Sequence, residues 1–229
     1  MIAKKNIIKV LILFLILHLF FWTLAPSISN INLPLDTIEA LAWGSNLDWG
    51  FNKHPPMSAF FSEVFFQIFG PQDWSYYLLS QIFVIISFYY VFKFSNEILN
   101  NNLLSLISVL LIEGIYFYNF TTPEFNVNVC QLPFWSLTVY YSWKVYNEKE
   151  IKLLDCLLVG LFAAFGFLSK YLFLYLLVSI DLLFIYFIFI KRERKFDFKY
   201  LLTFEIFLIV LVPHLIWLNN NEFITITYG

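Results

Sequence analysis

Charged residues are scarce in this sequence. Asp, Glu, Lys and Arg make up 13% of the 229 residues, whereas hydrophobic residues make up 60%. A soluble domain carries about a quarter charged residues, so this composition excludes an ordinary soluble protein and indicates a chain embedded in a membrane. The formal net charge of −2 is close to neutral and gives no indication of a nucleic-acid partner.

Cysteine and glycine are also few. The two cysteines, Cys130 and Cys156, have no metal-site spacing, and the topology argued below puts them near opposite membrane faces, which excludes a disulfide. The seven glycines form neither a phosphate-binding loop nor a G-x-G-x-x-G motif. We therefore expect neither a metal nor a resident cofactor.

Apolar runs and aromatic rings are what the sequence has in abundance. Aromatic residues make up 22% of the chain, and some should lie in interfacial belts. Residues 7–25 form an apolar run of about 19 residues, long enough to span a membrane. A cleaved signal peptide is the alternative, but the run is long for one and Ala25-Pro26-Ser27 is a poor cleavage site. Further candidate spans are residues 75–92, 103–118, 127–143, 153–168, 172–190 and 200–218.

The fold predicted from these runs is an all-α polytopic membrane protein with about seven transmembrane helices. Residues 57–69 are apolar over only about 13 residues, so we expect an amphipathic interfacial helix there. The whole chain, 1–229, is read as one membrane domain. It comprises a first span (1–25), a long outer loop with interfacial helices (26–74), the remaining spans (75–218) and an outer tail (219–229).

Lysine and arginine positions test this arrangement. If residues 57–69 do not cross the membrane, 12 of the 14 basic residues lie on the cytoplasmic side. If they do cross, most of the twelve, including the run at 191–195, move outside, against the positive-inside rule. Lys53 and Lys170 are then the two basic residues left outside, and an anionic ligand would explain both.

The stretch 36–56 carries the strongest functional pattern. Asp36 and Glu39 lie three apart, and Trp43 continues the same side of a helix. A capping box at the helix start is the alternative reading of the two acids. Lys53 and His54 precede two prolines, which restrict how His54 projects; contact with lipid headgroups is the alternative there.

Five further residues are candidates for the site. Glu113 is an acid inside a span, where ionisable groups are costly and usually paired or functional. Glu124 and Asn126 lie in an outer loop that could also be an ordinary turn. Lys170 could instead snorkel to the interface, and His214 could fill the backbone gap left by Pro213.

These residues together resemble the GT-C glycosyltransferases that use polyprenyl-phosphate sugars. The nearest resemblance is to the superfamily of protein O-mannosyltransferases and aminoarabinose transferases, glycosyltransferase family 39 and its relatives. The resemblance covers the whole chain. It depends on LPLDTIEALAWG at 33–44, LDWGFNKHPPMSA at 47–59, TPEFNVNVCQLPFW at 122–135, GFLSKY at 166–171 and VPHLIWLNNNEF at 212–223.

The resemblance implies an inverting, metal-independent sugar transfer on the outer face of a bacterial inner membrane, with the N-terminus cytoplasmic. The donor would be a sugar on undecaprenyl phosphate or a similar carrier, and the acceptor a glycan, lipid or protein. Asp36 would be the base and Glu39 a neighbouring site carboxylate. Lys53, with His54 beside it, would meet the donor phosphate, and Lys170 would belong to the same region.

Two departures from the family pattern bear on this interpretation. Many members have Glu directly after the Asp, whereas here Thr37 follows Asp36. Members also carry about a dozen spans, so the resemblance implies that this chain is only the N-terminal part. The alternatives are a transporter or flippase for a polyprenyl lipid, for which neither repeat symmetry nor broken midplane helices are evident, and a non-catalytic fragment.

Overall fold

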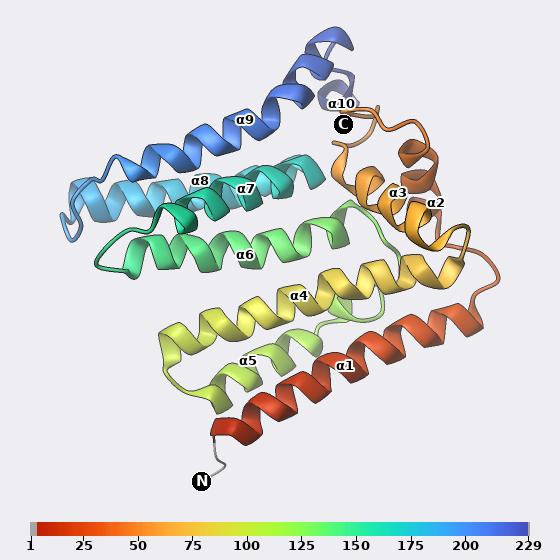
Figure 1. Cartoon of the computed structure of the whole chain (residues 1–229), viewed down its shortest axis with the longest axis horizontal. Coiled ribbons are helices and arrows are strands. Elements are labelled where there is room, and N and C mark those ends of the chain that lie inside the picture. Colours follow the sequence, from red (N-terminus) through yellow and green to blue (C-terminus); the bar gives the residue numbers. More distant parts are fainter. Residues whose placement is uncertain (1–3, 229) are drawn as a thin grey trace. The chain divides into compact units, whose positions relative to one another are not determined.

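The computed structural model describes residues 4–228, and every regular element in that range is helical (Figure 1). This confirms the all-α class. The elements are α1 (Lys4–Ser29), α2 (Leu35–Gly44), α3 (Met57–Phe69), α4 (Asp73–Leu99), α5 (Asn102–Glu113), η1 (Tyr116–Tyr118), α6 (Val127–Asn147), α7 (Leu153–Ser169), η2 (Tyr171–Phe173), α8 (Leu174–Ile185), η3 (Tyr186–Ile190), α9 (Lys199–Asn220) and α10 (Ile224–Thr227).

Four helical segments of the described chain are long and apolar enough to cross a membrane: Asn6–Ser29, Asp73–Leu99, Tyr171–Ile190 and Lys199–Asn220. The apolar helices α5 and α7 are shorter, with 12 and 17 residues. The span predicted at 103–118 ends as a helix at Glu113, because turns and the short η1 follow. A membrane protein with at least these spanning-capable helices is therefore supported, and the count of seven spans stays a prediction.

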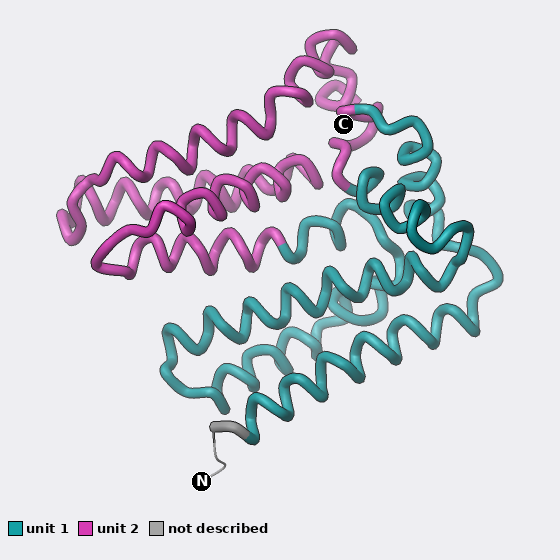
Figure 2. Tube along the Cα trace, viewed as in Figure 1, with its two compact units in different colours: residues 1–48, 58–133 teal, residues 49–57, 134–229 magenta. Residues whose placement is uncertain are grey.

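The chain divides into two compact units, coloured teal and magenta in Figure 2. Unit 1 comprises residues 1–48 and 58–133, and unit 2 comprises residues 49–57 and 134–229. The division falls inside α6 at Pro133, a residue without a backbone N–H to donate within the helix. It also falls inside the stretch 36–56, whose two halves belong to different units.

In unit 1, α4 packs against both α1 and α5. The fully buried side chains include Leu79, Val84 and Phe88 on α4, Leu11 on α1 and Val109 on α5. The apolar stripe of each helix is thereby buried in a shared core, away from water and lipid. This packing is the frame that carries the loop between α5 and α6.

In unit 2, α7 packs along α9. Val145, Cys156 and Val159 form a buried cluster near one end of these helices. Cys156 is buried here, and Cys130 is buried in unit 1. That they form no disulfide with each other stays a prediction.

Candidate functional site

Asp36 lies in the first turn of α2, but it does not cap the helix. The residue before the helix is Pro34, which makes no side-chain capping bond, so the capping-box reading of Asp36 and Glu39 is wrong. The cap comes from elsewhere in unit 1: the Asp36 backbone N–H donates to Oε1 of Glu124 at 3.1 Å. A carboxylate at a helix N-terminus also complements the positive end of the helix dipole.

A second contact fixes the same helix end. The hydroxyl of Thr37 donates to the backbone carbonyl of Phe125 at 3.3 Å, and both residues are fully buried. The next residue, Asn126, accepts from the backbone N–H groups of Asn128 and Val129 at 2.9 and 3.1 Å, and so caps α6. The loop that was predicted to carry site residues therefore docks α2 and starts α6.

Glu39 and Trp43 follow Asp36 at intervals of three and four residues on α2, so the three residues share one side of the helix. The neighbouring side, with Thr37, Ala40 and Gly44, is buried. A Cβ atom at Gly44 would lie 2.8 Å from the carbonyl oxygen of Ala59 on α3, so only glycine permits this close approach.

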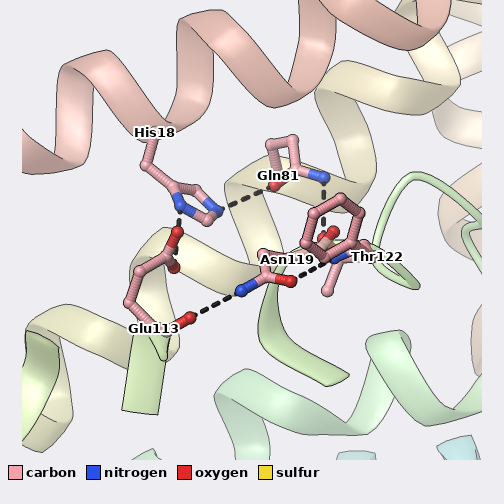
Figure 3. Close-up of polar contacts among 6 residues, drawn as sticks. His18, Gln81, Glu113, Asn119 and Thr122 are labelled. Atoms are coloured by element: carbon pink, nitrogen blue, oxygen red, sulfur yellow. Dashed lines mark hydrogen bonds and ion pairs between the residues drawn. The ribbon is translucent and has the colours of Figure 1, made fainter. Parts of the chain in front are cut away.

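Glu113 is paired, as expected of an acid within an apolar segment. Its Oε2 lies 3.1 Å from Nδ1 of His18, a side chain that is only 1% exposed (Figure 3). The other ring nitrogen of His18, Nε2, lies 3.1 Å from Oε1 of Gln81 on α4. Three elements of unit 1, α1, α4 and α5, are therefore joined by one histidine.

The same network reaches the α5–α6 loop. Gln81 donates through Nε2 to the hydroxyl of Thr122 at 3.2 Å, and that hydroxyl donates to the carbonyl of Asn119 at 2.8 Å. Asn119 in turn donates through Nδ2 to the backbone carbonyl of Glu113 at 2.6 Å (Figure 3). Ser80 donates to the carbonyl of Thr122. The ring of contacts fixes the loop two residues before Glu124.

The stretch after Asp48 is fixed by unit 2. His214, which is fully buried, lies with Nδ1 2.5 Å from the carbonyl oxygen of Trp49 and with Nε2 2.7 Å from the hydroxyl of Tyr171. A carbonyl only accepts, so Nδ1 carries the proton and Nε2 accepts from Tyr171. His214 therefore holds a loop and a neighbouring helix end, and the reading in which it fills the gap left by Pro213 is wrong.

Two more contacts hold this loop. A Cβ atom at Gly50 would lie 2.3 Å from Cε3 of Trp217, so the loop backbone lies directly on the indole ring. Thr225 donates its hydroxyl to the carbonyl of Phe51 at 2.6 Å, and the Phe51 N–H donates to the carbonyl of His54 at 3.1 Å. The segment that carries Lys53 and His54 is therefore shaped by the far end of the sequence.

Lys170 has extended backbone (φ −160°, ψ 133°) between α7 and η2, directly before Tyr171. Tyr171, next to Lys170, and Trp49, in the loop that carries Lys53, both contact the imidazole of His214. His214 therefore holds both of these segments.

The predicted residues thus form two groups, one in each unit. Unit 1 holds Asp36, Glu39, Trp43, Glu113, Glu124 and Asn126, and unit 2 holds Lys53, His54, Lys170 and His214. The sequence analysis missed His18, Gln81, Tyr171 and Trp217. Only His18 had a usable signal, as an ionisable residue in the middle of the first apolar run. No group of three or more His, Cys, Asp or Glu side chains placed to hold a metal occurs within residues 4–228.

Comparison with known proteins gives one match. Residues 53–217, more than two thirds of the chain, match the model of the dolichyl-phosphate-mannose-protein mannosyltransferase family. Neither the curated proteins nor the solved structures contain a match. The matched range includes Lys53, His54, Glu113, Glu124, Lys170 and His214. This chain is a member of the dolichyl-phosphate-mannose-protein mannosyltransferase family, a family of GT-C type glycosyltransferases.

Proposed function

We propose that this protein transfers a sugar from a polyprenyl-phosphate donor to an acceptor on the outer face of a bacterial inner membrane, with inversion and without a metal. The observation that carries the proposal is the family match over residues 53–217. The family is named for a lipid-phosphate sugar, dolichyl-phosphate-mannose, which agrees with a loop that carries Lys53 and His54 in a chain rich in apolar helices.

Asp36 is proposed as the general base. It would take the proton of the acceptor hydroxyl or amine while that atom bonds to the anomeric carbon and the bond from this carbon to the phosphate oxygen breaks. The electron pair leaves with the phosphate, so no acid is needed, and Lys53, His54 and Lys170 would stabilise the departing charge. Glu124, which accepts from the Asp36 backbone, supports this role by fixing the start of α2, and is itself a positioning residue.

Asp36→Asn tests the role of the carboxylate. Asp36 is not the cap of α2, so the substitution should not disturb the start of the helix. Asparagine has the size of aspartate, and the contact with Glu124 is made by the backbone N–H, which the substitution keeps. Removal of a general base commonly lowers the rate by about 10²–10⁴-fold, and we expect that loss in turnover with donor binding unchanged. The assay uses radiolabelled polyprenyl-phosphate mannose as donor and membranes of the expressing cells as acceptor.

Two further variants make the result specific. Asp48→Asn removes another acid of the same stretch and should leave turnover unchanged. Lys53→Ala should weaken donor binding as well as turnover, because a phosphate contact acts in both the ground state and the transition state. Wild-type turnover in Asp36→Asn would assign the base elsewhere, with Glu39 tested next.

A further inference from the structure

Unit 2 contains two adjoining pockets at the end of the bundle remote from Lys53 and Lys170. The first, of about 310 Å³, is mainly apolar and lies among α6, α7, α8, η3 and α9, with Val145, Ile185 and Ile188 in its walls. The second, of about 580 Å³, is lined by residues of 146–152 and 193–200 and is rich in charge. Phe196 and Tyr200 line both pockets, so an apolar chamber and a charged chamber adjoin there.

Basic and acidic residues both line the charged chamber. Its lining includes five basic residues (Lys149, Lys152, Arg194, Lys195 and Lys199) and four acidic ones (Glu148, Glu150, Glu193 and Asp197), a net charge of +1. The two segments that contribute most of the lining, 144–152 and 191–199, together contain eight basic and four acidic residues. Glu148 is already matched, since Nζ of Lys152 lies 2.8 Å and Nζ of Lys144 3.3 Å from its carboxylate oxygens. The hydrogen bond from Lys152, assisted by that from Lys144, lowers the pKa of Glu148, so this acid is ionised at neutral pH.

Backbone contacts give the charged chamber a defined rim. Arg194 donates to the carbonyl oxygens of Asn147 and Glu148 at 2.8 and 3.4 Å. Lys199 donates to the carbonyl of Ile151 at 3.0 Å. These three bonds tie segment 191–199 to segment 147–152, so the chamber is a built feature of unit 2 and not two independent loops.

The apolar chamber also contains polar groups. Ser142 lies in its wall and is 5% exposed, and its hydroxyl has no hydrogen-bond partner within the described chain. A buried hydroxyl without a partner is costly, so Ser142 is available to an acceptor such as an ester carbonyl. Asp181 lies in the α8 wall ten residues before Lys191, about 15 Å along the helix, so a phosphate in the charged chamber would not lie beside it.

We propose that the two chambers form a site for one anionic phospholipid of the bilayer. The headgroup phosphate would bind among Lys149, Arg194, Lys195 and Lys199, and an acyl chain would occupy the apolar chamber. Basic pockets between transmembrane helices bind anionic headgroups in this way. Two adjoining chambers, one apolar and one charged, suit a ligand with charge at one end and hydrocarbon at the other. The site is separate from the proposed transferase chemistry and does not depend on it.

Native mass spectrometry of the full chain in detergent tests the proposal, with phosphatidylglycerol and phosphatidylcholine of the same acyl chains as probes. We expect the wild type to retain phosphatidylglycerol preferentially. Each basic residue near an anionic lipid contributes roughly fivefold in affinity, so the double variant Lys149→Gln, Lys195→Gln should bind about 30-fold more weakly. The matched control, Lys9→Gln with Lys93→Gln, removes two basic residues of unit 1 and should leave binding unchanged.

A second pair of variants tests the apolar chamber. Ile185→Trp should fill part of it and reduce retention, whereas Leu182→Trp, on an exposed part of α8 that does not line the chamber, should not. Equal retention of the two lipids would overturn the proposal, as would equal losses in the two lysine double variants. Displacement of the lipid by millimolar inorganic phosphate alone would also overturn it, because the charged chamber would then take phosphate without a chain.

Discussion

At the scale of single residues, the polar network around His18 is the clearest structural result. A membrane-embedded histidine, an acid and an amide would each be costly alone, and here the imidazole lies between the other two, with one ring nitrogen 3.1 Å from the carboxylate of Glu113 and the other 3.1 Å from the amide oxygen of Gln81. The sequence indicated that Glu113 needed a partner. It could not indicate which one, because His18 is 95 residues away and the pairing depends on how α1 packs against α5.

Glu113→Ala should therefore destabilise the protein. It leaves the buried imidazole of His18 without its carboxylate, and an unsatisfied buried polar group costs about 1–3 kcal/mol. The free energy of unfolding in detergent measures the loss. Glu97→Ala, an exposed acid near the end of α4, is the matched control and should change stability by less than about 0.5 kcal/mol.

A combined variant separates pairing from packing. His18→Leu with Glu113→Leu replaces both partners by apolar side chains, and Gln81→Leu is added to it because Oε1 of the buried Gln81 would otherwise lose its contact with His18. The combined variant should be more stable than Glu113→Ala, because none of these three buried polar side chains is then left unpaired. If Glu113→Ala loses no more stability than Glu97→Ala, the contact with His18 contributes nothing and the network in Figure 3 is incidental.

At the scale of elements, the apolar runs were sufficient to locate the helices. The runs predicted at 75–92, 127–143 and 200–218 lie inside α4, α6 and α9. The sequence was less informative between helices. It gave the stretch 36–56 as one motif, whereas the structure attaches its first half to Glu124 and Phe125 and its second half to His214 and Trp217. Such contacts join residues up to 174 positions apart, as between Phe51 and Thr225, beyond any local pattern.

Gly50→Ala tests the contact between this loop and α9. The added methyl group would lie within 2.3 Å of the Trp217 ring, so either the ring or the loop must move. Overpacking of this kind costs typically about 1–3 kcal/mol. We also expect faster proteolysis between residues 49 and 57, and weaker binding of the polyprenyl-phosphate donor.

The control and the rescue both follow from the same geometry. Gly114→Ala adds a methyl group whose nearest neighbour is the carbonyl oxygen of Leu111 at 3.3 Å, where the backbone is helical, so it should have a smaller effect than Gly50→Ala. Trp217→Leu in the Gly50→Ala background makes room and should restore protection of the loop. Protection that is unchanged in Gly50→Ala would show that the indole ring does not hold the loop.

At the scale of the whole molecule, charge is sorted within unit 2. The basic segments 144–152 and 191–199 contact each other at one end of the helices. Tyr171, the residue after Lys170, and Trp49, in the loop that carries Lys53, both contact His214, which lies 15 residues after Lys199 along α9. This sorting agrees with the positive-inside argument made from the sequence, because the basic segments lie together at one end of the helices of unit 2.

Membrane orientation can be measured with the exposed positions of the chain. Native Cys130 and Cys156 are buried, so they should not react with a bulky maleimide. We expect Asn46→Cys and Asn52→Cys to be labelled in intact cells by a membrane-impermeant maleimide, because the proposed site loop lies outside. Lys149→Cys and Lys195→Cys should be labelled only after permeabilisation, since their segments carry the positive surplus. All four positions are exposed, so a failure to label reports the side of the membrane and not burial. Labelling of position 149 or 195 in intact cells would show that the orientation is the opposite of the proposed one, and the proposed transfer would then face the cytoplasm.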